Sequence, residues 1–268
     1  MYCMTTAPVA DLHVHTTASD GQLTVEQLPN VAQQADIEWI AVTDHDRIHP
    51  KLSAPVTRRD GVGIIRGIEL RVAAGDQRVD LLGYGVEPTA ELTTELDRLQ
   101  DDRQTRGGRI IDRVESRLDV ALPIEPRPGI GRPHIARAIA ESEAPYDYDR
   151  AFAELIGNDG SCYVPRAVTP VDRGIELLSA ACGVVSLAHP FRYPDSEAAL
   201  ELAARLDGIE YVYPYGRDVP TDRLEEVCNS HELLRTGGSD THGEQVGQVG
   251  LGREAFERFR RRLQPTVS

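Results

Sequence analysis

The sequence predicts an α/β fold of the barrel type that carries a mainly helical insertion. In the 268-residue chain, strand-like stretches alternate with helix-like stretches near both ends, and this alternation indicates parallel βαβ units. The number of these units favours a barrel over a short open sheet. Between the two alternating regions the pattern becomes long, charged and helical. We therefore expect one barrel domain that is interrupted by an insertion.

The N-terminal units follow from the apolar patterns. Residues 11–15 alternate between polar and apolar side chains, which predicts a strand. We expect a helix to begin at Thr24, where Gln27 three positions later completes a capping box. Pro29 should kink this helix or shift its start, because proline lacks a backbone N–H. Three further apolar runs predict strands at residues 39–45, 63–70 and 78–86.

The pattern changes after Pro88 and changes back at residue 164. Residues 89–119 are typical of a long charged helix, and shorter helical segments follow a stretch rich in proline and glycine. From residue 164 the strand–helix alternation returns, with a helix start at residues 169–172 and later strands at 184–190, 208–214 and 233–240. The expected domains are a barrel formed by residues 1–88 and 164–268, and an insertion that covers residues 89–163.

Composition and charge argue against several classes of protein. No apolar run reaches membrane-spanning length, no signal-peptide pattern is visible, and the four cysteines form no CxxC pair. We therefore expect a cytoplasmic protein with reduced thiols and no membrane partner. The formal net charge of −14 repels nucleic acid at long range. A stable nucleic-acid partner is not expected, and a phosphate ligand must be held by local positive charge.

Polar side chains gather at the carboxyl ends of the predicted strands, where the loops of an α/β barrel build the active site. His13 and His15 share one face of the first strand because they stand two positions apart. Imidazole and carboxylate groups suit Zn²⁺, Mn²⁺ and Fe²⁺. One such ion takes about four ligands, so the larger number of donors predicts more than one ion, and about three if a carboxylate bridges two of them. The nine candidate ligands are His13, His15, Asp20, His45, Glu69, Asp80, His189, Asp240 and His242.

The motifs HVHTTASDG, AVTDHD, GIEL, LAHP and GGSDTHG, in this order, closely resemble the polymerase and histidinol phosphatase (PHP) superfamily of metal-dependent phosphoesterases. GRPHIARA, YVPR and LLGYGV are similar to one branch, the nucleoside 3′,5′-bisphosphate phosphatases and related 5′→3′ exoribonucleases. The resemblance implies a distorted (β/α) barrel of about seven strands. It also implies two to three divalent ions, namely Mn²⁺, Zn²⁺ or Fe²⁺, with Mg²⁺ as a further option.

The resemblance also implies how the ligands divide among three ions. The second ion would share Glu69 and use His189. At position 80 this chain departs from the family, which usually has a histidine there. An aspartate is a harder donor that favours Mn²⁺ or Mg²⁺, and the replacement could instead leave the second site empty. The first ion would be held by His13, His15, Glu69 and Asp240, and the third by Asp20, His45 and His242.

The expected reaction is hydrolysis of a phosphomonoester of a nucleotide-like substrate. A metal-bound hydroxide is the expected nucleophile, and no side-chain nucleophile is needed. Arg132 and His134, in GRPHIAR, and Arg192, just after AHP, are the candidates for substrate phosphate contact. Asp44 and Asp46 either orient His45 or belong to a solvated loop.

Several alternatives remain open at the level of sequence. One is a 5′→3′ exonuclease that acts on short RNA or DNA oligonucleotides. One feature favours it, a stripe of arginines on the predicted helix that lines a substrate entrance or is a solvated face. The stripe consists of Arg103, Arg106, Arg109, Arg113 and Arg117. Another is a small-molecule phosphatase that resembles histidinol phosphatase. A non-catalytic metal-binding module ranks last, because the ligand set is complete apart from the replacement at Asp80.

Overall fold

A computed structural model describes residues 7–263 and divides the chain into two compact units. The first unit is built from the part of the chain up to Thr93 and the part from Thr169 onwards, and the second unit is Thr94–Val168. The sequence pattern places the two boundaries after residues 88 and 163. None of the helices within residues 7–263 combines the length and apolar character needed to span a bilayer.

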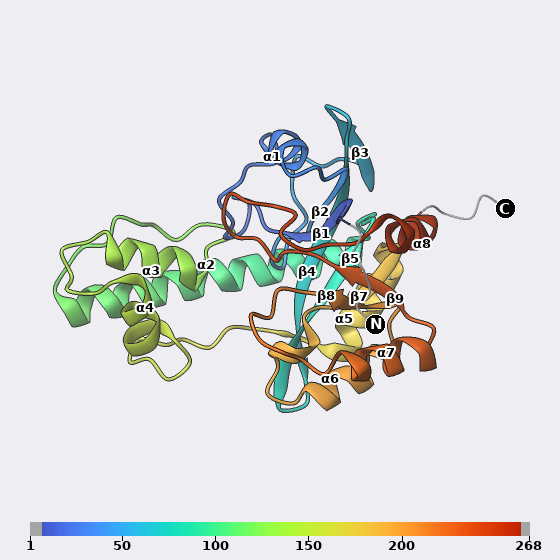
Figure 1. The fold of residues 1–268 in the computed structure, drawn as a ribbon. Helices are drawn as coiled ribbons and strands as arrows, with labels where there is room; N and C mark the ends of the chain where they lie inside the picture. Colours follow the sequence, from blue (N-terminus) through green and yellow to red (C-terminus); the bar gives the residue numbers. More distant parts are fainter. Residues whose placement is uncertain (1–6, 264–268) are drawn as a thin grey trace. The chain divides into compact units, whose positions relative to one another are not determined.

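The first unit is an α/β fold whose sheet curls into a half-barrel, which confirms the predicted fold class (Figure 1). Neighbouring strands follow the order β1-β2-β4-β5-β7-β8-β9, and β3 and β6 each pair with β4. Parallel pairing joins β1 to β2, β2 to β4, β7 to β8 and β8 to β9. The strands are β1 (Ala10–Val14), β2 (Trp39–Val42), β3 (Val56–Arg59), β4 (Val62–Ala74), β5 (Gln77–Tyr84), β6 (Thr169–Pro170), β7 (Val184–Leu187), β8 (Gly208–Val212) and β9 (Leu234–Gly237).

The middle of the sheet departs from the predicted parallel βαβ pattern. β4 and β5 form a long antiparallel hairpin, and β5 is also antiparallel to β7 (Figure 1). Only Gly75 and Asp76 connect β4 to β5, and Gly75 has a φ of +60°, a left-handed conformation that glycine adopts at little cost. This two-residue turn leaves no room for a crossover helix, so the expectation of parallel strands is wrong here.

Among the described residues of the first unit, five α-helices connect or follow the strands. They are α1 (Leu28–Gln34), α5 (Val171–Ala181), α6 (Ser196–Ala203), α7 (Thr221–Ser230) and α8 (Arg253–Leu263), and a short 3₁₀ helix, η2 (Pro190–Arg192), follows β7. α1 begins at Leu28 and not at Thr24, with Pro29 in its first turn. Proline fits there because the first N–H groups of a helix have no intrahelical partner. The predicted start at Thr24 is therefore wrong, and of the two effects expected from Pro29 the shift occurs.

The core of the first unit packs both faces of the sheet with aliphatic and a few aromatic side chains. Trp39, Tyr84, Phe256 and Phe259 belong to one buried cluster, together with Leu12 from β1. Val14 belongs to a second cluster between β1, β2 and α1. Leu12 and Val14 thus fix the register of β1. This register determines the face of the strand on which His13, between them, lies.

The second unit is helical and has its own core. Its elements are α2 (Ala90–Leu118), α3 (Arg132–Ala140), the short α4 (Tyr148–Arg150) and a π-helical turn, η1 (Ala151–Ile156). α2 continues through Gly107 and Gly108. A Cβ at Gly107 would lie 2.8 Å from the Ile130 side chain, so the close packing at this position requires glycine. The arginine stripe of α2 does not form one exposed face, since Arg103 and Arg106 are buried in the described structure.

Candidate metal centre

β1 delivers the first two candidate ligands to a buried position. His13 and His15 are fully buried, with ring centroids 5.2 Å apart. The segment after β9 runs close to β1 because Gly238 has no side chain, and a Cβ at this position would lie 2.3 Å from the His13 backbone nitrogen. This close approach brings Asp240, from a distant part of the sequence, beside both imidazoles.

The structure brings all nine candidate ligands into one cluster in the first unit. They form four groups, and within each group the ligand atoms lie within 4.8 Å of one another. Each candidate belongs to at least one group, and residues in two groups join the groups into a continuous cluster. The groups are His15, Asp20, His45 and His242; His13, His189 and Asp240; His13, His15 and Glu69; and Glu69, Asp80 and His189.

The chemistry of these side chains fits divalent ions. Asp240 Oδ1 lies 3.4 Å from Nε2 of His13 and 3.2 Å from Nε2 of His15. Buried polar atoms normally have a hydrogen-bond partner. Within residues 7–263, however, the atoms His13 Nε2, Asp20 Oδ1 and both ring nitrogens of His15 are buried without one. Donor atoms that converge without bonding one another are what a metal site requires.

Burial and the neighbouring histidines shift the pKa values of the carboxyl groups in the cluster in opposite directions. Burial favours the neutral form of Asp240, but His13 and His15 hold its pKa well below its usual range. Similarly, burial opposes the ionised form of Asp20, and the neighbouring His45, His242 and His15 outweigh it and lower its pKa. These carboxylates are therefore ionised, which is the form that binds a cation.

Two buried acidic residues that support the cluster are not among the candidates predicted from the sequence. Glu210 of β8 places Oε1 3.0 Å from His13 Nδ1, and its Oε2 accepts a hydrogen bond of 2.7 Å from the backbone N–H of His189. Asp11 of β1 accepts hydrogen bonds from the backbone N–H and the hydroxyl of Ser239, at 2.9 and 2.6 Å. The available signal was an ionisable residue inside an apolar strand, in GIEYV and ADLHV.

Asp44 and Asp46, the two neighbours of His45 in the sequence, are both buried. Asp44 is fully buried and accepts hydrogen bonds from the backbone N–H and hydroxyl of Thr16 and from the hydroxyl of Ser19. The solvated-loop alternative is therefore wrong for Asp44, which holds the loop that leads to Asp20. Asp46 is also buried, and its Oδ1 accepts a hydrogen bond of 3.1 Å from the backbone N–H of Arg71.

Asp80 lies in the cluster but has a partner that the sequence did not predict. Arg71 forms a bidentate ion pair with it, with Nε 2.7 Å from Oδ1 and Nη2 2.5 Å from Oδ2. Asp80 Oδ2 also lies 3.8 Å from His189 Nε2. At the position where the family resemblance implies a histidine, the chain thus has a carboxylate that is paired with an arginine.

Arg192, one of the three candidates for substrate contact, lies beside the cluster. Its Nη1 donates to Asp240 Oδ2 at 3.0 Å and to the hydroxyl of Tyr213 at 2.7 Å. Tyr213, which was missed from the sequence, itself donates to Asp240 Oδ2 at 2.8 Å. The Arg192 side chain is 55% exposed, so a guanidinium at the edge of the cluster is open to an anionic ligand.

Arg132 and His134 belong to the second unit. Arg132 Nη1 donates to the Asn158 side chain at 3.0 Å, and His134 Nδ1 accepts from the Gly131 N–H at 3.1 Å at the start of α3. A local group of arginines lies in this unit: burial, with Arg132, Arg166 and Arg103 nearby, lowers the pKa of Arg106 to about 10.

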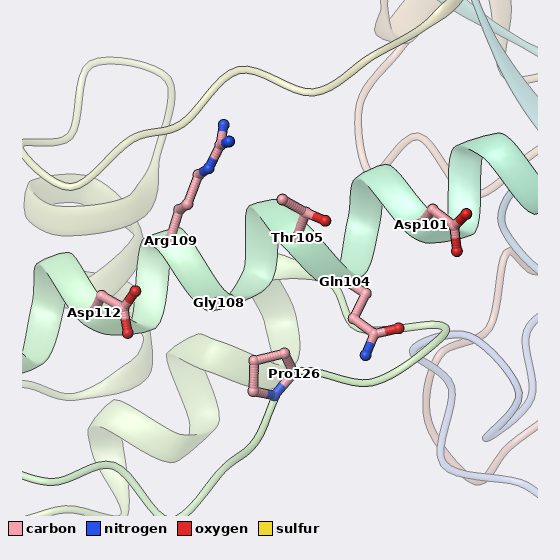
Figure 2. A pocket seen from close by; sticks show the side chains of 7 residues that line it. All are labelled: Asp101, Gln104, Thr105, Gly108, Arg109, Asp112 and Pro126. Carbon is pink, nitrogen blue, oxygen red and sulfur yellow. The ribbon is translucent and has the colours of Figure 1, made fainter.

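The second unit also has a hollow of about 560 Å³ along α2. Figure 2 shows Gln104 extending toward the segment of Pro126, while Arg109 extends to the other side of the helix. Asp101, Thr105, Gly108 and Asp112 complete the lining. None of the nine candidate ligands lines this hollow, so it is not part of the metal cluster.

Comparison with known proteins gives a family match and several relatives. A family model described as PHP domain matches residues 11–165. The 5′–3′ exoribonuclease Rnm of Escherichia coli (strain K12) is 27% identical over 265 residues, which covers 93% of this chain and 90% of that protein. The 3′,5′-nucleoside bisphosphate phosphatase of Chromobacterium violaceum is 26% identical over 256 residues and covers 90% of both chains.

A cyclic phosphodiesterase and a solved structure are also similar to this chain. The phosphoribosyl 1,2-cyclic phosphate 1,2-diphosphodiesterase of Eggerthella lenta is 30% identical over 265 residues, which covers 91% of this chain and 98% of that protein. A crystal structure of a protein from Bifidobacterium adolescentis has the same fold, with a TM-score of 0.79 at 23% identity, and covers 96% of this chain and 97% of that one.

Proposed function

This chain belongs to the PHP domain family and is a metal-dependent phosphoesterase, and on this premise we propose that it hydrolyses a phosphomonoester of a nucleotide-like substrate, with a nucleoside 3′,5′-bisphosphate as the first candidate. The observation that carries the proposal is the buried cluster of nine histidine and carboxylate side chains, several of whose donor atoms have no hydrogen-bond partner within the described residues.

We assign the ligands to ions as follows. Glu69 stands between the groups, because it shares one group with His13 and His15 and another with Asp80 and His189. Divalent ions held here would supply a water ligand of lowered pKa and would neutralise the oxygens of the phosphoryl group. One ion is assigned to His13, His15, Glu69 and Asp240, and another to Asp20, His45 and His242.

The chain's own side chains have separate tasks in this reaction. Water adds to phosphorus and loses a proton, while the ester P–O bond breaks and the leaving oxygen gains a proton, so the products are inorganic phosphate and an alcohol. Arg192 offers a guanidinium at the edge of the cluster, where it can pair with the phosphoryl oxygens. Tyr213 and Asp240 fix the position of that guanidinium from the protein side.

A nucleotide-like substrate is favoured by aromatic side chains near the cluster. The ring of Tyr213 lies 5.4 Å from that of His189 and 4.7 Å from that of Tyr215, which in turn lies 5.7 Å from Phe191. Phe191 is buried, but Tyr213 and Tyr215 are partly exposed. Partly exposed aromatic faces stack on nucleobases of any identity. We also propose Arg132 and His134 as phosphate contacts, because Arg132 belongs to the local group of arginines around Arg106.

A second candidate function is 5′–3′ exonuclease activity on short oligonucleotides. The similarity to the exoribonuclease of Escherichia coli favours it. The formal net charge of −14 counts against a long oligonucleotide, because it repels a polyanion. A mononucleotide with two phosphates needs only local positive charge, so it ranks first.

The test is a substrate panel with the Mn²⁺-loaded protein. Inorganic phosphate and nucleotide products are measured with adenosine 3′,5′-bisphosphate, AMP, phosphoribosyl 1,2-cyclic phosphate, histidinol phosphate and a short 5′-phosphorylated RNA. The highest kcat/KM is expected for the bisphosphate, and Asp240→Asn should lose activity while the exposed control Asp218→Asn keeps it. Preferred turnover of the RNA would replace the first candidate with the second. No turnover of any substrate would refute both.

A further inference from the structure

The antiparallel register of the β4–β5 hairpin places Arg71 directly opposite Asp80. Directly opposed residues of an antiparallel pair point to the same face, so the two side chains meet. Glu69 lies two positions before Arg71 on β4 and shares that face. The hairpin therefore carries a carboxylate of the cluster, an arginine and a second carboxylate side by side.

The ion pair between Arg71 and Asp80 engages both carboxylate oxygens. Nε lies 2.7 Å from Oδ1 and Nη2 lies 2.5 Å from Oδ2, which is the fork arrangement in which a guanidinium binds a carboxylate most firmly. The Asp80 side chain is fully buried, and that of Arg71 is 33% exposed. The backbone of Asp80 is also fixed, because its N–H donates to the Tyr193 hydroxyl at 2.8 Å.

The same carboxylate belongs to the group formed with Glu69 and His189. His189 Nε2 lies 3.1 Å from Glu69 Oε1 and 3.8 Å from Asp80 Oδ2. Two carboxylates and one guanidinium leave one net negative charge in this group. A divalent ion bound there would have to share Asp80 with a permanent positive charge, which repels it. The residues at this group therefore do not fit a tightly bound ion.

We propose that Arg71, by its bidentate bond to Asp80, takes the place of a metal ion at the group of Glu69, Asp80 and His189, so that this chain binds two divalent ions tightly and not three. The inference rests on the proposed metal centre and specifies it further. Asp80 then serves as an anchor for the guanidinium and is not a ligand.

The test is the metal content of the folded protein, measured without reference to activity. Wild type, Arg71→Met, Asp80→Asn and the control Arg78→Met are stripped with a chelator, reloaded with excess Mn²⁺, desalted and measured by elemental analysis. Arg78 is exposed and lies two positions before Asp80 on the same strand. Wild type, Asp80→Asn and the control should hold about two ions per chain, and Arg71→Met about three, because the freed Asp80 becomes available as a ligand.

The outcomes separate this inference from the proposed function. Three tightly held ions in the wild type, with normal phosphate release, would overturn the role of Arg71 and leave the phosphoesterase intact. The same holds if Asp80→Asn loses an ion, because Asp80 would then be a ligand. If Arg71→Met does not fold, the wild type and Asp80→Asn still decide the question. A wild type without bound metal and without phosphate release would overturn the proposed function itself.

Discussion

The Nδ1 atom of His13 lies 3.0 Å from Oε1 of Glu210, and both side chains are fully buried. A carboxylate oxygen accepts, so Nδ1 donates, and Nε2 is directed into the cluster, 3.4 Å from Asp240 Oδ1. The second carboxylate oxygen of Glu210 receives the backbone N–H of His189. One glutamate on β8 therefore orients two of the candidate ligands, although no candidate ligand comes from β8 itself.

Replacement of Glu210 by glutamine or alanine should weaken metal binding. Groups that orient a ligating histidine typically change metal affinity by about 10- to 100-fold when they are removed. The glutamine variant should lose less than the alanine variant, since its side-chain oxygen can still accept from His13. Calorimetric titration of the stripped protein with Mn²⁺ measures the change, and the exposed Glu201→Gln on α6 is the control. Equal affinity in wild type and Glu210→Ala would show that this contact does not orient a ligand.

The loop between His15 and Asp20 should depend on Asp44. This carboxylate accepts from the Thr16 N–H at 2.8 Å, the Thr16 hydroxyl at 2.8 Å and the Ser19 hydroxyl at 2.6 Å. Asp44→Ala leaves these buried donors without an acceptor, so the free energy of unfolding should fall by about 3 kcal/mol. Urea unfolding in the presence of a chelator measures this loss without a contribution from bound metal, with Asp218→Ala as the control. A change below about 0.5 kcal/mol would contradict the structural role of Asp44.

Arg192 should act on substrate binding more than on metal binding. Its guanidinium contacts Asp240 and Tyr213 and is half-exposed. Arg192→Met should raise KM about 10-fold or more for the best phosphomonoester, and Arg192→Lys should recover part of this loss because it restores the charge without the fork. Metal content should stay at the wild-type level in both variants. Loss of bound metal in Arg192→Met would instead show that the residue positions Asp240.

Cys182 should make the protein less stable at alkaline pH. Burial, with Asp207 nearby, raises the pKa of this thiol to about 12. The unfolded thiol ionises near its ordinary pKa of about 8.5, so above this pH the unfolded chain binds fewer protons than the folded chain and stability falls as pH rises. We therefore compare the free energy of unfolding of wild type and Cys182→Ala in urea at pH 8 and pH 10.5. Between these pH values the difference should shift by about 2.5 kcal/mol in favour of the variant. A difference that is the same at both pH values would refute this.

Glu69 and Asp80 lie inside the two strands of the β4–β5 hairpin. The positions of the other seven candidate ligands could be predicted because they lie near or after the carboxyl end of a recognisable apolar strand. Parallel strands gather such ends at one edge of the sheet whatever the register between them. Arg71 could not be paired with Asp80 in this way, since their contact depends on the register of the β4–β5 hairpin. The two-residue turn at Gly75 was the signal for that hairpin. Glu210 was hidden because one acidic residue in an apolar strand does not reveal which imidazole it will contact.

The buried cluster of the first unit should support phosphoester hydrolysis only when it holds divalent ions. The direct measurement is phosphate release from adenosine 3′,5′-bisphosphate by the chelator-stripped protein, before and after Mn²⁺ is added. We predict that the stripped protein has less than about 1% of the reloaded rate. Mn²⁺ should restore the rate in wild type and not in Asp240→Asn. Full activity of the stripped protein, or restoration in Asp240→Asn, would contradict hydrolysis by metal ions held in this cluster.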